Sequence, residues 1–255
     1  MGESAMEDGR VLYLDLMKKV LTNVIYADPA QAADWYDGSG YEPEKRENGL
    51  DWPTTAHTMV GLKRLDNLQF CVERVLMDEV PGDFVETGVW RGGASIFTRA
   101  VLQAHGITDR TVWLADSFQG MPETTDDSHP VDRYMALHKS NDQLAVSLEQ
   151  VQANFRAYDL LDEQVRFLEG WFADTLPTAP IERIAVLRLD GDLYDSTMDA
   201  LESLYPKVSP GGYVIVDDYV IPSCKEAVHD YRTRLAIDDE IVPIDASSAY
   251  WRRAA

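Results

Sequence analysis

Short apolar runs alternate with helical segments from residue 83 onward, and this alternation constrains the fold most. Apolar runs of about four to eight residues are typical of strands buried on both faces of a parallel sheet. Strands are expected at residues 83–89, 111–116, 164–169, 184–189 and 213–216, with a closing antiparallel pair at 240–244 and 249–252. Strands that alternate with helices predict an α/β fold with a doubly wound, mainly parallel, seven-stranded sheet.

Helix start signals support the segments between these strands. Helices are expected at residues 92–105, from Ser147 onward, at 196–205, and from Ser223 to about Leu235. Ser147 with Gln150, and Ser223 with Glu226, have the spacing of a capping box, which satisfies the first free amides of a helix. Residues 209–212 (SPGG) are expected to form the turn before the fifth strand.

The remaining segments predict a helical N-terminal extension and lid at residues 1–80, before the main domain at 81–255. Residues 1–10 are expected to form a loose tail, followed by helices at 11–25 and 54–79. Residues 26–50 are polar and rich in Asp, Gly and Pro, and residues 121–146 form a second polar insertion in the main domain. Long excursions of this kind often act as lids or binding loops.

Composition limits the classes of partner. The 255 residues carry a net charge of −21, which argues against a nucleic-acid partner and against an anionic membrane surface. No apolar run reaches the roughly 20 residues that span a bilayer, and the acidic N-terminus does not resemble a secretory signal. The two cysteines, Cys71 and Cys224, lie far apart in the sequence, which favours a reducing, cytoplasmic compartment.

Two neighbouring expected strands end at aspartates. Residues 184–192 (IAVLRLDGD) contain Asp190 and Asp192, and residues 212–218 (GYVIVDD) end at Asp217 and Asp218. If these strands pair, Asp190, Asp217 and Asp218 converge at the edge where α/β sheets bind ligands, and three clustered carboxylates need a cation or a shared proton. Hard oxygen ligands favour Mg²⁺ or Ca²⁺ over zinc.

Asp192 lies beside this expected metal site and is a candidate general base. The alternative is that Asp192 only caps the helix that follows its strand. Asp217 and Asp218 could likewise form a solvated strand end without a metal.

Three other strand ends carry residues suited to a nucleoside ligand. Residues 86–93 (ETGVWRGG) join a strand to a helix whose free amides can donate hydrogen bonds to an anionic group. The glycine spacing is not that of dinucleotide binders. Asp116 can accept hydrogen bonds from ribose hydroxyls, and Trp171 with Phe172 can flank an adenine. The alternative for residues 86–93 is a tight turn without a ligand. Asp116 could instead cap a helix or be a solvated carboxylate, and Trp171 with Phe172 could be ordinary core residues.

Several long motifs together resemble the macrocin O-methyltransferase family. They are DFVETGVWRGGAS, WLADSFQGMP, LDEQVRFLEGWFADTLPTAP, VLRLDGDLYDST and GGYVIVDDY, with the N-terminal YLDLMKKVL, the HTMVG segment and the C-terminal YWRR. The resemblance covers almost the whole chain and extends to the methyltransferases of the mycinamicin and novobiocin pathways. It implies a class I, S-adenosylmethionine- and Mg²⁺-dependent enzyme that methylates a sugar hydroxyl in antibiotic biosynthesis.

The resemblance also implies roles for individual residues. The cofactor-binding set is Thr58, Met59, Glu86, Thr87, Gly88, Arg91, Ser95, Asp116, Ser117, Gly170, Trp171, Phe172 and Asp190. Asp190, Asp217 and Asp218 would carry Mg²⁺, and Asp192 would be the base. The family further implies at least a homodimer, with N-terminal segments in the contacts. Tyr134 and Leu137 are candidate acceptor contacts from their place in the second insertion alone.

Three competing functions stay open. The same carboxylates would serve a metal-dependent O-methyltransferase of a catechol or other phenol, because any vicinal diol can chelate the ion. A nicotinamide-dependent oxidoreductase is disfavoured by the glycine spacing. A non-catalytic nucleoside-binding module would have little need for the complete set of base and metal ligands.

Overall fold

A seven-stranded sheet organises the chain, in the order β3-β2-β1-β4-β5-β7-β6. The computed structural model describes residues 3–32, 38 and 40–254. The strands are β1 (Asp83–Thr87), β2 (Val112–Asp116), β3 (Val165–Glu169), β4 (Ile184–Leu189), β5 (Val208–Val216), β6 (Val242–Pro243) and β7 (Ala249–Arg252). The first five are parallel, and β7 pairs antiparallel with β5 and β6. The predicted doubly wound sheet is therefore confirmed.

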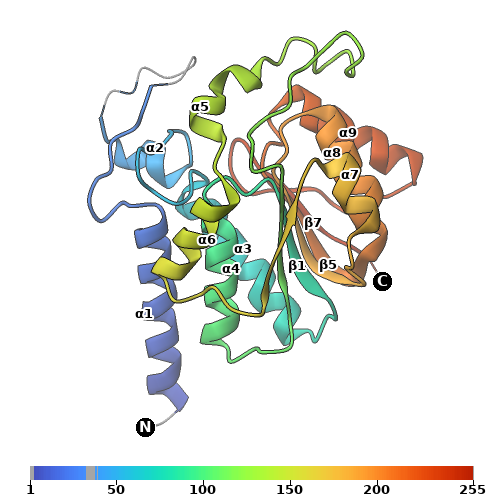
Figure 1. The fold of residues 1–255 in the computed structure, drawn as a ribbon. Coiled ribbons are helices and arrows are strands. Elements are labelled where there is room, and N and C mark those ends of the chain that lie inside the picture. The colour runs from blue at the N-terminus through green and yellow to red at the C-terminus, as the bar shows by residue number, and fades with distance from the viewer. Residues whose placement is uncertain (1–2, 33–37, 39, 255) are drawn as a thin grey trace.

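Helices cover both faces of the sheet (Figure 1). One layer contains α1 (Glu3–Leu21), α3 (Gly61–Met77), α4 (Gly93–Ala104) and α6 (Leu148–Ala157). The other contains α7 (Phe172–Thr175), α8 (Tyr194–Leu204) and α9 (Pro222–Arg234). A separate hydrophobic core lies beneath each layer. None of the helices in the described ranges is both apolar enough and long enough to cross a membrane.

The N-terminal extension differs from the prediction in its boundaries. Helix α1 begins at Glu3, so the expectation of a loose tail over residues 1–10 is wrong from Glu3 onward, and residues 1–2 lie outside the described residues. Helix α3 begins only at Gly61, seven residues after the expected start at 54. Gly61 has a φ of 76°, and an added Cβ would lie 2.4 Å from the amide nitrogen of Gly49. The chain therefore turns sharply before α3 can start.

Two further local predictions need correction. Ser223 does not cap α9, because Pro222 occupies the start of the helix and Ile221 is its N-cap. Residues 209–212 belong to β5 rather than to a turn, and they accommodate a register shift against β4. The Ser147 cap is confirmed, since its hydroxyl accepts a hydrogen bond from the Gln150 amide at 3.3 Å.

Both insertions lie at the upper end of the sheet as drawn in Figure 1, beyond the carboxyl ends of the parallel strands. Residues 26–50 contain the short helix α2 (Pro43–Glu47), in agreement with the expectation of short helices at most, although residues 33–37 and 39 lie outside the described residues. The second insertion contains η1 (Leu137–Ser140) and α5 (Asn141–Leu144). In open α/β sheets this edge is where ligands bind.

Candidate active site

A cavity of about 760 Å³ lies at the carboxyl edge of the sheet, between the two insertions. It is lined by the ends of β1, β2, β4 and β5 and by residues of both insertions. The predicted residues in its lining are Thr58, Met59, Glu86, Gly88, Asp116, Ser117, Leu137, Trp171, Phe172, Asp190, Asp192, Asp217 and Asp218. The structure thus brings most of the sequence-predicted site residues to one place.

The backbones of β1 and β4 approach closely at the floor of the cavity. Gly88 has a φ of 84°, and a Cβ at this position would lie 1.8 Å from the carbonyl oxygen of Asp190. Only glycine fits between the two strand ends, because any side chain would collide with backbone. Gly88 therefore brings Glu86 on β1 close to the aspartates that follow β4.

Glu86 is held from both sides within the protein. Its carboxylate accepts hydrogen bonds from the Ser95 hydroxyl on α4 and from the Arg188 guanidinium at 2.7 Å. Burial raises the pKa of Glu86 to about 7, although the charge of Arg188 acts in the opposite direction. Glu86 is therefore a fixed acceptor at the start of the cavity.

Asp116 ends β2 and is fixed by the backbone of the two turns beside it. Its carboxylate oxygens accept hydrogen bonds from the amides of Val89 at 2.7 Å and Phe118 at 2.8 Å. Burial raises the pKa of Asp116. Trp171 is 39% exposed and lines the cavity, so the alternative that it is an ordinary core residue is wrong.

Asp190, Asp217 and Asp218 converge as expected. Oxygen atoms of the three carboxylates lie within 4.8 Å of one another. Asp217 is 5% exposed, so the alternative of a solvated strand end is wrong. Its two oxygens accept from Arg188 at 2.5 Å and from Arg64 at 2.6 Å.

The three carboxylates are not equally well paired. Asp190 accepts a hydrogen bond from Arg188 at 2.6 Å, whereas Oδ2 of Asp218 is buried and has no hydrogen-bond partner among the described residues. Burial and the charges of the neighbouring aspartates raise the pKa of Asp218 well above its usual range. An unpartnered carboxylate oxygen is what a cation ligand would provide, so this donor set fits a hard divalent cation.

Asp192 lines the same cavity beside the three carboxylates. Burial, with repulsion from Asp190 and Asp217, raises the pKa of Asp192 to about 7. The N-cap of helix α8 is Leu193, and the N-cap side chain makes no hydrogen bond to the helix. The alternative that Asp192 caps this helix is therefore wrong. A carboxylate with a pKa near 7 can accept a proton near neutral pH.

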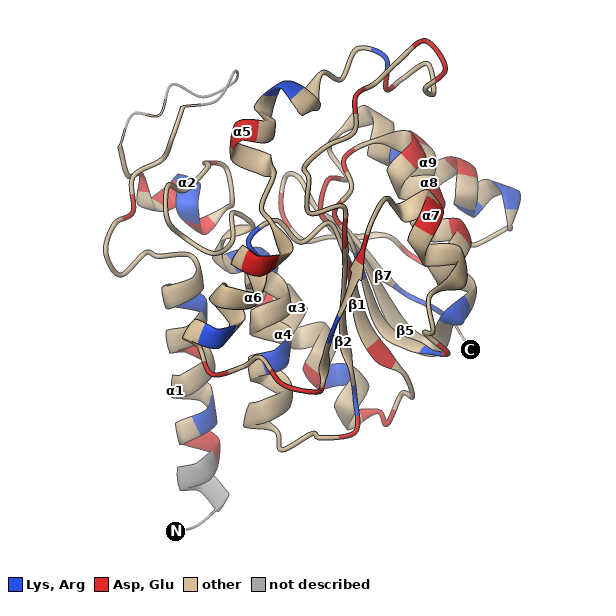
Figure 2. Cartoon of the chain, in the orientation of Figure 1, with Lys and Arg blue, Asp and Glu red and all other residues tan. Residues whose placement is uncertain are grey.

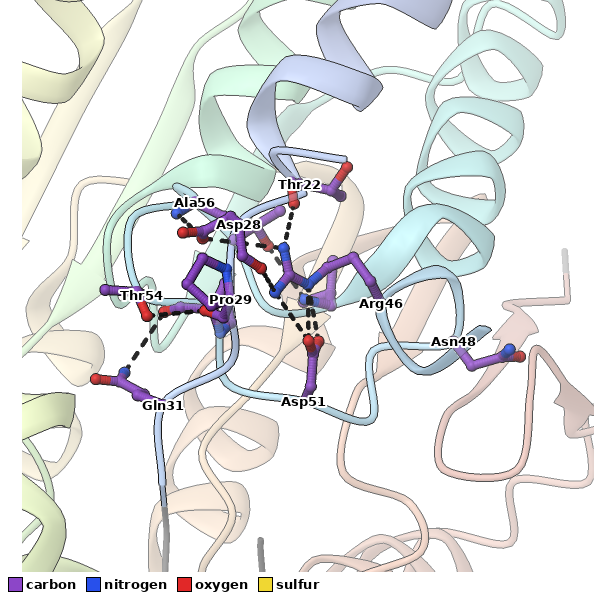
Figure 3. Close-up of polar contacts among 12 residues, drawn as sticks. Thr22, Asp28, Pro29, Gln31, Arg46, Asn48, Asp51, Thr54 and Ala56 are labelled. Carbon is purple, nitrogen blue, oxygen red and sulfur yellow. Dashed lines mark hydrogen bonds and ion pairs between the residues drawn. The ribbon is translucent and has the colours of Figure 1, made fainter. Parts of the chain in front are cut away.

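A buried ionic cluster fixes the first insertion as one wall of the cavity (Figure 3). Arg46 is 0% exposed, and its guanidinium donates to the Asp51 carboxylate and to the carbonyls of Thr22 and Asp28. The Asp28 carboxylate in turn accepts from the amide of Ala56 at 2.9 Å. A buried arginine with several partners holds the chain around it rigidly, because breaking one contact leaves a buried charge.

Comparison with known proteins agrees with this geometry. The family described as macrocin-O-methyltransferase (TylF) matches residues 10–253. The chain belongs to the macrocin O-methyltransferase family. It is accordingly an S-adenosylmethionine-dependent O-methyltransferase with the class I fold.

Relatives of this macrocin O-methyltransferase family member match it over nearly their whole length. It is 66% identical over 249 residues to the 8-demethyl-8-(2,3-dimethoxy-alpha-L-rhamnosyl)-tetracenomycin-C 4'-O-methyltransferase of Streptomyces olivaceus, covering 98% of this chain and 95% of the relative. It is 59% identical to the mycinamicin III 3''-O-methyltransferase of Micromonospora griseorubida, covering 97% and 98%. The solved O-methyltransferase NovP superposes with a TM-score of 0.93 at 59% identity, covering 96% of this chain and 100% of NovP.

Some residues that the family resemblance singled out lie behind the cavity lining of this methyltransferase. The Ser95 hydroxyl donates a hydrogen bond to the Glu86 carboxylate, and Arg91 donates to the carbonyl of Ala56 at 2.8 Å. Ser95 and Arg91 therefore support segments of the cavity wall without lining the cavity themselves. Thr87 and Gly170 are also absent from the lining. Tyr134 is 91% exposed and, unlike Leu137, does not line the cavity. Their direct contact with cofactor or acceptor stays a prediction.

The sequence reasoning missed the cationic partners of the site. Arg188 is buried on β4 and contacts Glu86, Asp190 and Asp217. Arg64 on α3 joins Asp217 to Asp245. Arg188 had a visible signal, because it is a charged residue within an apolar strand and a buried charge requires partners. Arg64 had none, because α3 is amphipathic and carries other charged residues.

The acidic excess of the enzyme has two different locations. Figure 2 shows Asp and Glu spread over the helices α7, α8 and α9, while the site carboxylates lie at the ends of β1, β4 and β5. The carboxylates on these helices are exposed, except that Asp199 on α8 is partly buried and lines the cavity. The site carboxylates are buried and therefore need cations or protons.

Proposed function

We propose that this enzyme transfers a methyl group from S-adenosylmethionine to a sugar hydroxyl of an antibiotic or related natural product, with Mg²⁺ as a second cofactor. The observation that carries the proposal is the placement of Asp192 and three convergent carboxylates in one cavity with Glu86 and Asp116. The relative from Streptomyces olivaceus, whose name specifies a rhamnosyl-tetracenomycin, supports the sugar.

The cavity supports an acceptor in which the sugar is already attached to an apolar aglycone. Its volume of about 760 Å³ lies in the upper part of the range for small-molecule sites, roughly 300–1,000 Å³. Apolar side chains of the second insertion and of the loop before α9 line part of the cavity, and we place the acceptor against them. These are Met121, Met135, Leu137, Leu144, Val220 and Ile221.

A sugar hydroxyl is a weak nucleophile until it loses its proton. Asp192 is proposed to accept that proton as the hydroxyl oxygen attacks the methyl carbon in line with the departing sulfur. Glu86 would hold the amino group of the cofactor and Asp116 its ribose, which positions the sulfonium near the carboxylate group. Holding the reacting atoms in line supplies several kcal/mol of the rate enhancement.

The metal proposal rests on the chemistry of the donor set. Asp190, Asp217 and Asp218 would hold Mg²⁺, which would stabilise negative charge on the acceptor oxygen. Asp217 already accepts from two arginines, but each carboxylate oxygen has a second lone pair available for a cation. The site carboxylates outnumber Arg188 and Arg64, so additional positive charge would stabilise their ionised forms.

Mg²⁺ dependence is tested by removing Asp218. Chelation should abolish methylation and added Mg²⁺ should restore it, whereas Asp218→Ala should need at least about tenfold more Mg²⁺ for half-maximal activity, since it removes one of three ligands. Thermal stability should not fall, because Oδ2 of Asp218 has no hydrogen-bond partner to lose in the part of the chain that the structure describes.

The acceptor class is tested in the same assay with glycosylated polyketides and with catechols. Methylation of a glycoside but not of its aglycone supports the proposal. A preference for catechols would contradict the assignment of a sugar acceptor. Activity that chelation leaves unchanged would contradict the assignment of Mg²⁺.

We also propose a homodimer formed through α1. The apolar spacing in this helix predicted the helix correctly, but the stripe lies at the surface, with Leu12 71% and Leu16 53% exposed. Leu14, Met17 and Leu21 face the core instead. Exposed apolar stripes of this kind are typical of protein contacts.

The dimer is tested by Leu12→Asp together with Leu16→Asp. The wild type should elute as a dimer in light-scattering chromatography and the double variant as a folded monomer. A wild type that is monomeric at micromolar concentration would contradict the proposal.

We also propose a cytoplasmic location for the enzyme. It is supported by Cys71 and Cys224, which are both free thiols.

A further inference from the structure

Helix α8 begins directly after the proposed base, and its first amides are capped by another part of the chain. Leu193, its N-cap residue, has an apolar side chain that cannot accept a hydrogen bond. Asp132, in the second insertion, accepts from the amide of Tyr194 at 2.8 Å and from that of Asp195 at 3.1 Å. The first amides of a helix need acceptors, so this insertion supplies what α8 lacks.

A second set of contacts reinforces this cap. The ring of His129 stacks on the ring of Tyr194, with centroids 3.6 Å apart and an angle of 9° between the planes. The amide of His129 also donates to the carboxylate of Asp195 at 3.1 Å. We refer to these contacts of Asp132 and His129 with Tyr194 and Asp195 as the clasp. It joins the second insertion to the start of α8.

Asp192 depends on this neighbourhood for its backbone conformation. Its φ of 55° lies in the left-handed region, which is uncommon for residues other than glycine, so the contacts on either side of it help to hold this conformation. On one side, Ser223 of α9 donates to the Asp192 carbonyl at 3.3 Å. On the other side, the chain continues through Leu193 into the two amides that Asp132 caps.

We propose that Asp132 is a positioning residue, which holds Asp192 in its catalytic conformation when the second insertion covers the acceptor. This inference rests on the proposed function of Asp192 as the base. Asp132 is 1% exposed, and its own segment also provides Met135 and Leu137 to the cavity lining. An acceptor that packs against those side chains stabilises the closed insertion and, through the clasp, the base.

Among the described residues of the first insertion, none hydrogen-bonds to the start of α8. The first insertion is held by Arg46, which is 0% exposed and contacts Asp51, Thr22 and Asp28 inside that wall. The second insertion has its buried carboxylate directed at the helix of the base instead. The two insertions therefore differ, one being a fixed wall and the other a cover connected to catalysis.

The test compares Asp132→Ala with Asp127→Ala, an exposed carboxylate of the same insertion. Asp132→Ala should increase hydrogen exchange at the amides of Tyr194 and Asp195 and lower kcat, each by roughly five- to tenfold, the population effect of losing a helix cap. Binding of S-adenosylhomocysteine should stay within about twofold, because the hydrogen bonds that hold Glu86 and Asp116 involve no residue of the clasp. Asp132→Asn keeps one acceptor oxygen, so its hydrogen exchange and its kcat should lie between those of the wild type and those of Asp132→Ala.

Each outcome decides the proposal. Faster exchange with unchanged kcat would show that the clasp only stabilises α8, and unchanged exchange would show that Asp132 does not hold the helix start. A kcat loss of equal size in Asp127→Ala would also overturn it. If the wild type binds S-adenosylhomocysteine but methylates no glycoside, the proposed function fails. The clasp is tested separately, because unchanged hydrogen exchange at Tyr194 and Asp195 in Asp132→Ala would exclude it whatever the methylation result.

Discussion

Asp192→Asn should lower kcat by about 10²- to 10⁴-fold, the usual contribution of a positioned general base. The amide has nearly the same shape as the carboxylate but cannot accept the hydroxyl proton. Binding of S-adenosylhomocysteine should be retained, because Glu86 and Asp116 are fixed by contacts that do not involve Asp192. Single-turnover methylation and calorimetric titration measure the two effects separately.

Asp199→Asn is the matched control for this change. Asp199 lies on α8, lines the same cavity, and has its pKa raised by burial to about 6. Loss of a negative charge from the cavity wall is therefore common to both variants, whereas proximity to the three convergent carboxylates is particular to Asp192. A kcat within a few-fold of wild type in Asp192→Asn would remove this residue from the mechanism.

The strands could be predicted because short apolar runs that alternate with helical segments are typical of a buried parallel sheet. Residues 184–189 are buried throughout, and the expected bounds of this strand are those observed. The convergence of Asp190 with Asp217 and Asp218 followed from one assumption, the pairing of β4 with β5. Sheet topology thus determined most of the site.

Helix ends were predicted less well, because competing local signals are equally compatible with the sequence. Ser223 and Glu226 have capping-box spacing, but Pro222 fits the first helical turn and shifts the N-cap to Ile221. Helix α1 starts earlier than predicted, and its residues 7–9 are exposed, so this part of the helix has no buried face. Residues 3–10 are polar and acidic, and that composition is as compatible with a surface helix as with a tail.

Contacts of the insertions lay beyond sequence reasoning. Asp132 stands among polar residues without periodicity, and its partners Tyr194 and Asp195 lie about sixty positions away. Arg46 likewise resembles any surface arginine in the sequence, yet it is fully buried. Only the packed structure shows which of many charged residues in a polar segment is internal.

Arg188→Met should destabilise the protein by about 3–5 kcal/mol, the typical cost of leaving a buried charge without its partner. Arg188 contacts Glu86, Asp190 and Asp217 at 2.5 to 2.7 Å, so its removal leaves three carboxylates without their shared cation. Urea denaturation at pH 8 with a chelator measures the free energy of unfolding. Arg166→Met, a change of an exposed arginine on β3, should stay within about 0.5 kcal/mol.

The dependence on pH identifies the cause of the destabilisation. Burial already raises the pKa of Glu86 to about 7 and raises that of Asp190 with the guanidinium present, so without Arg188 both folded-state pKa values should lie further above their unfolded values. Protonation of such groups stabilises the folded state at low pH, and this contribution is lost as pH rises through the folded pKa. The deficit of Arg188→Met should therefore be smaller at pH 6 than at pH 8. An equal deficit at both would assign the effect to lost packing of the long side chain rather than to unpaired carboxylates.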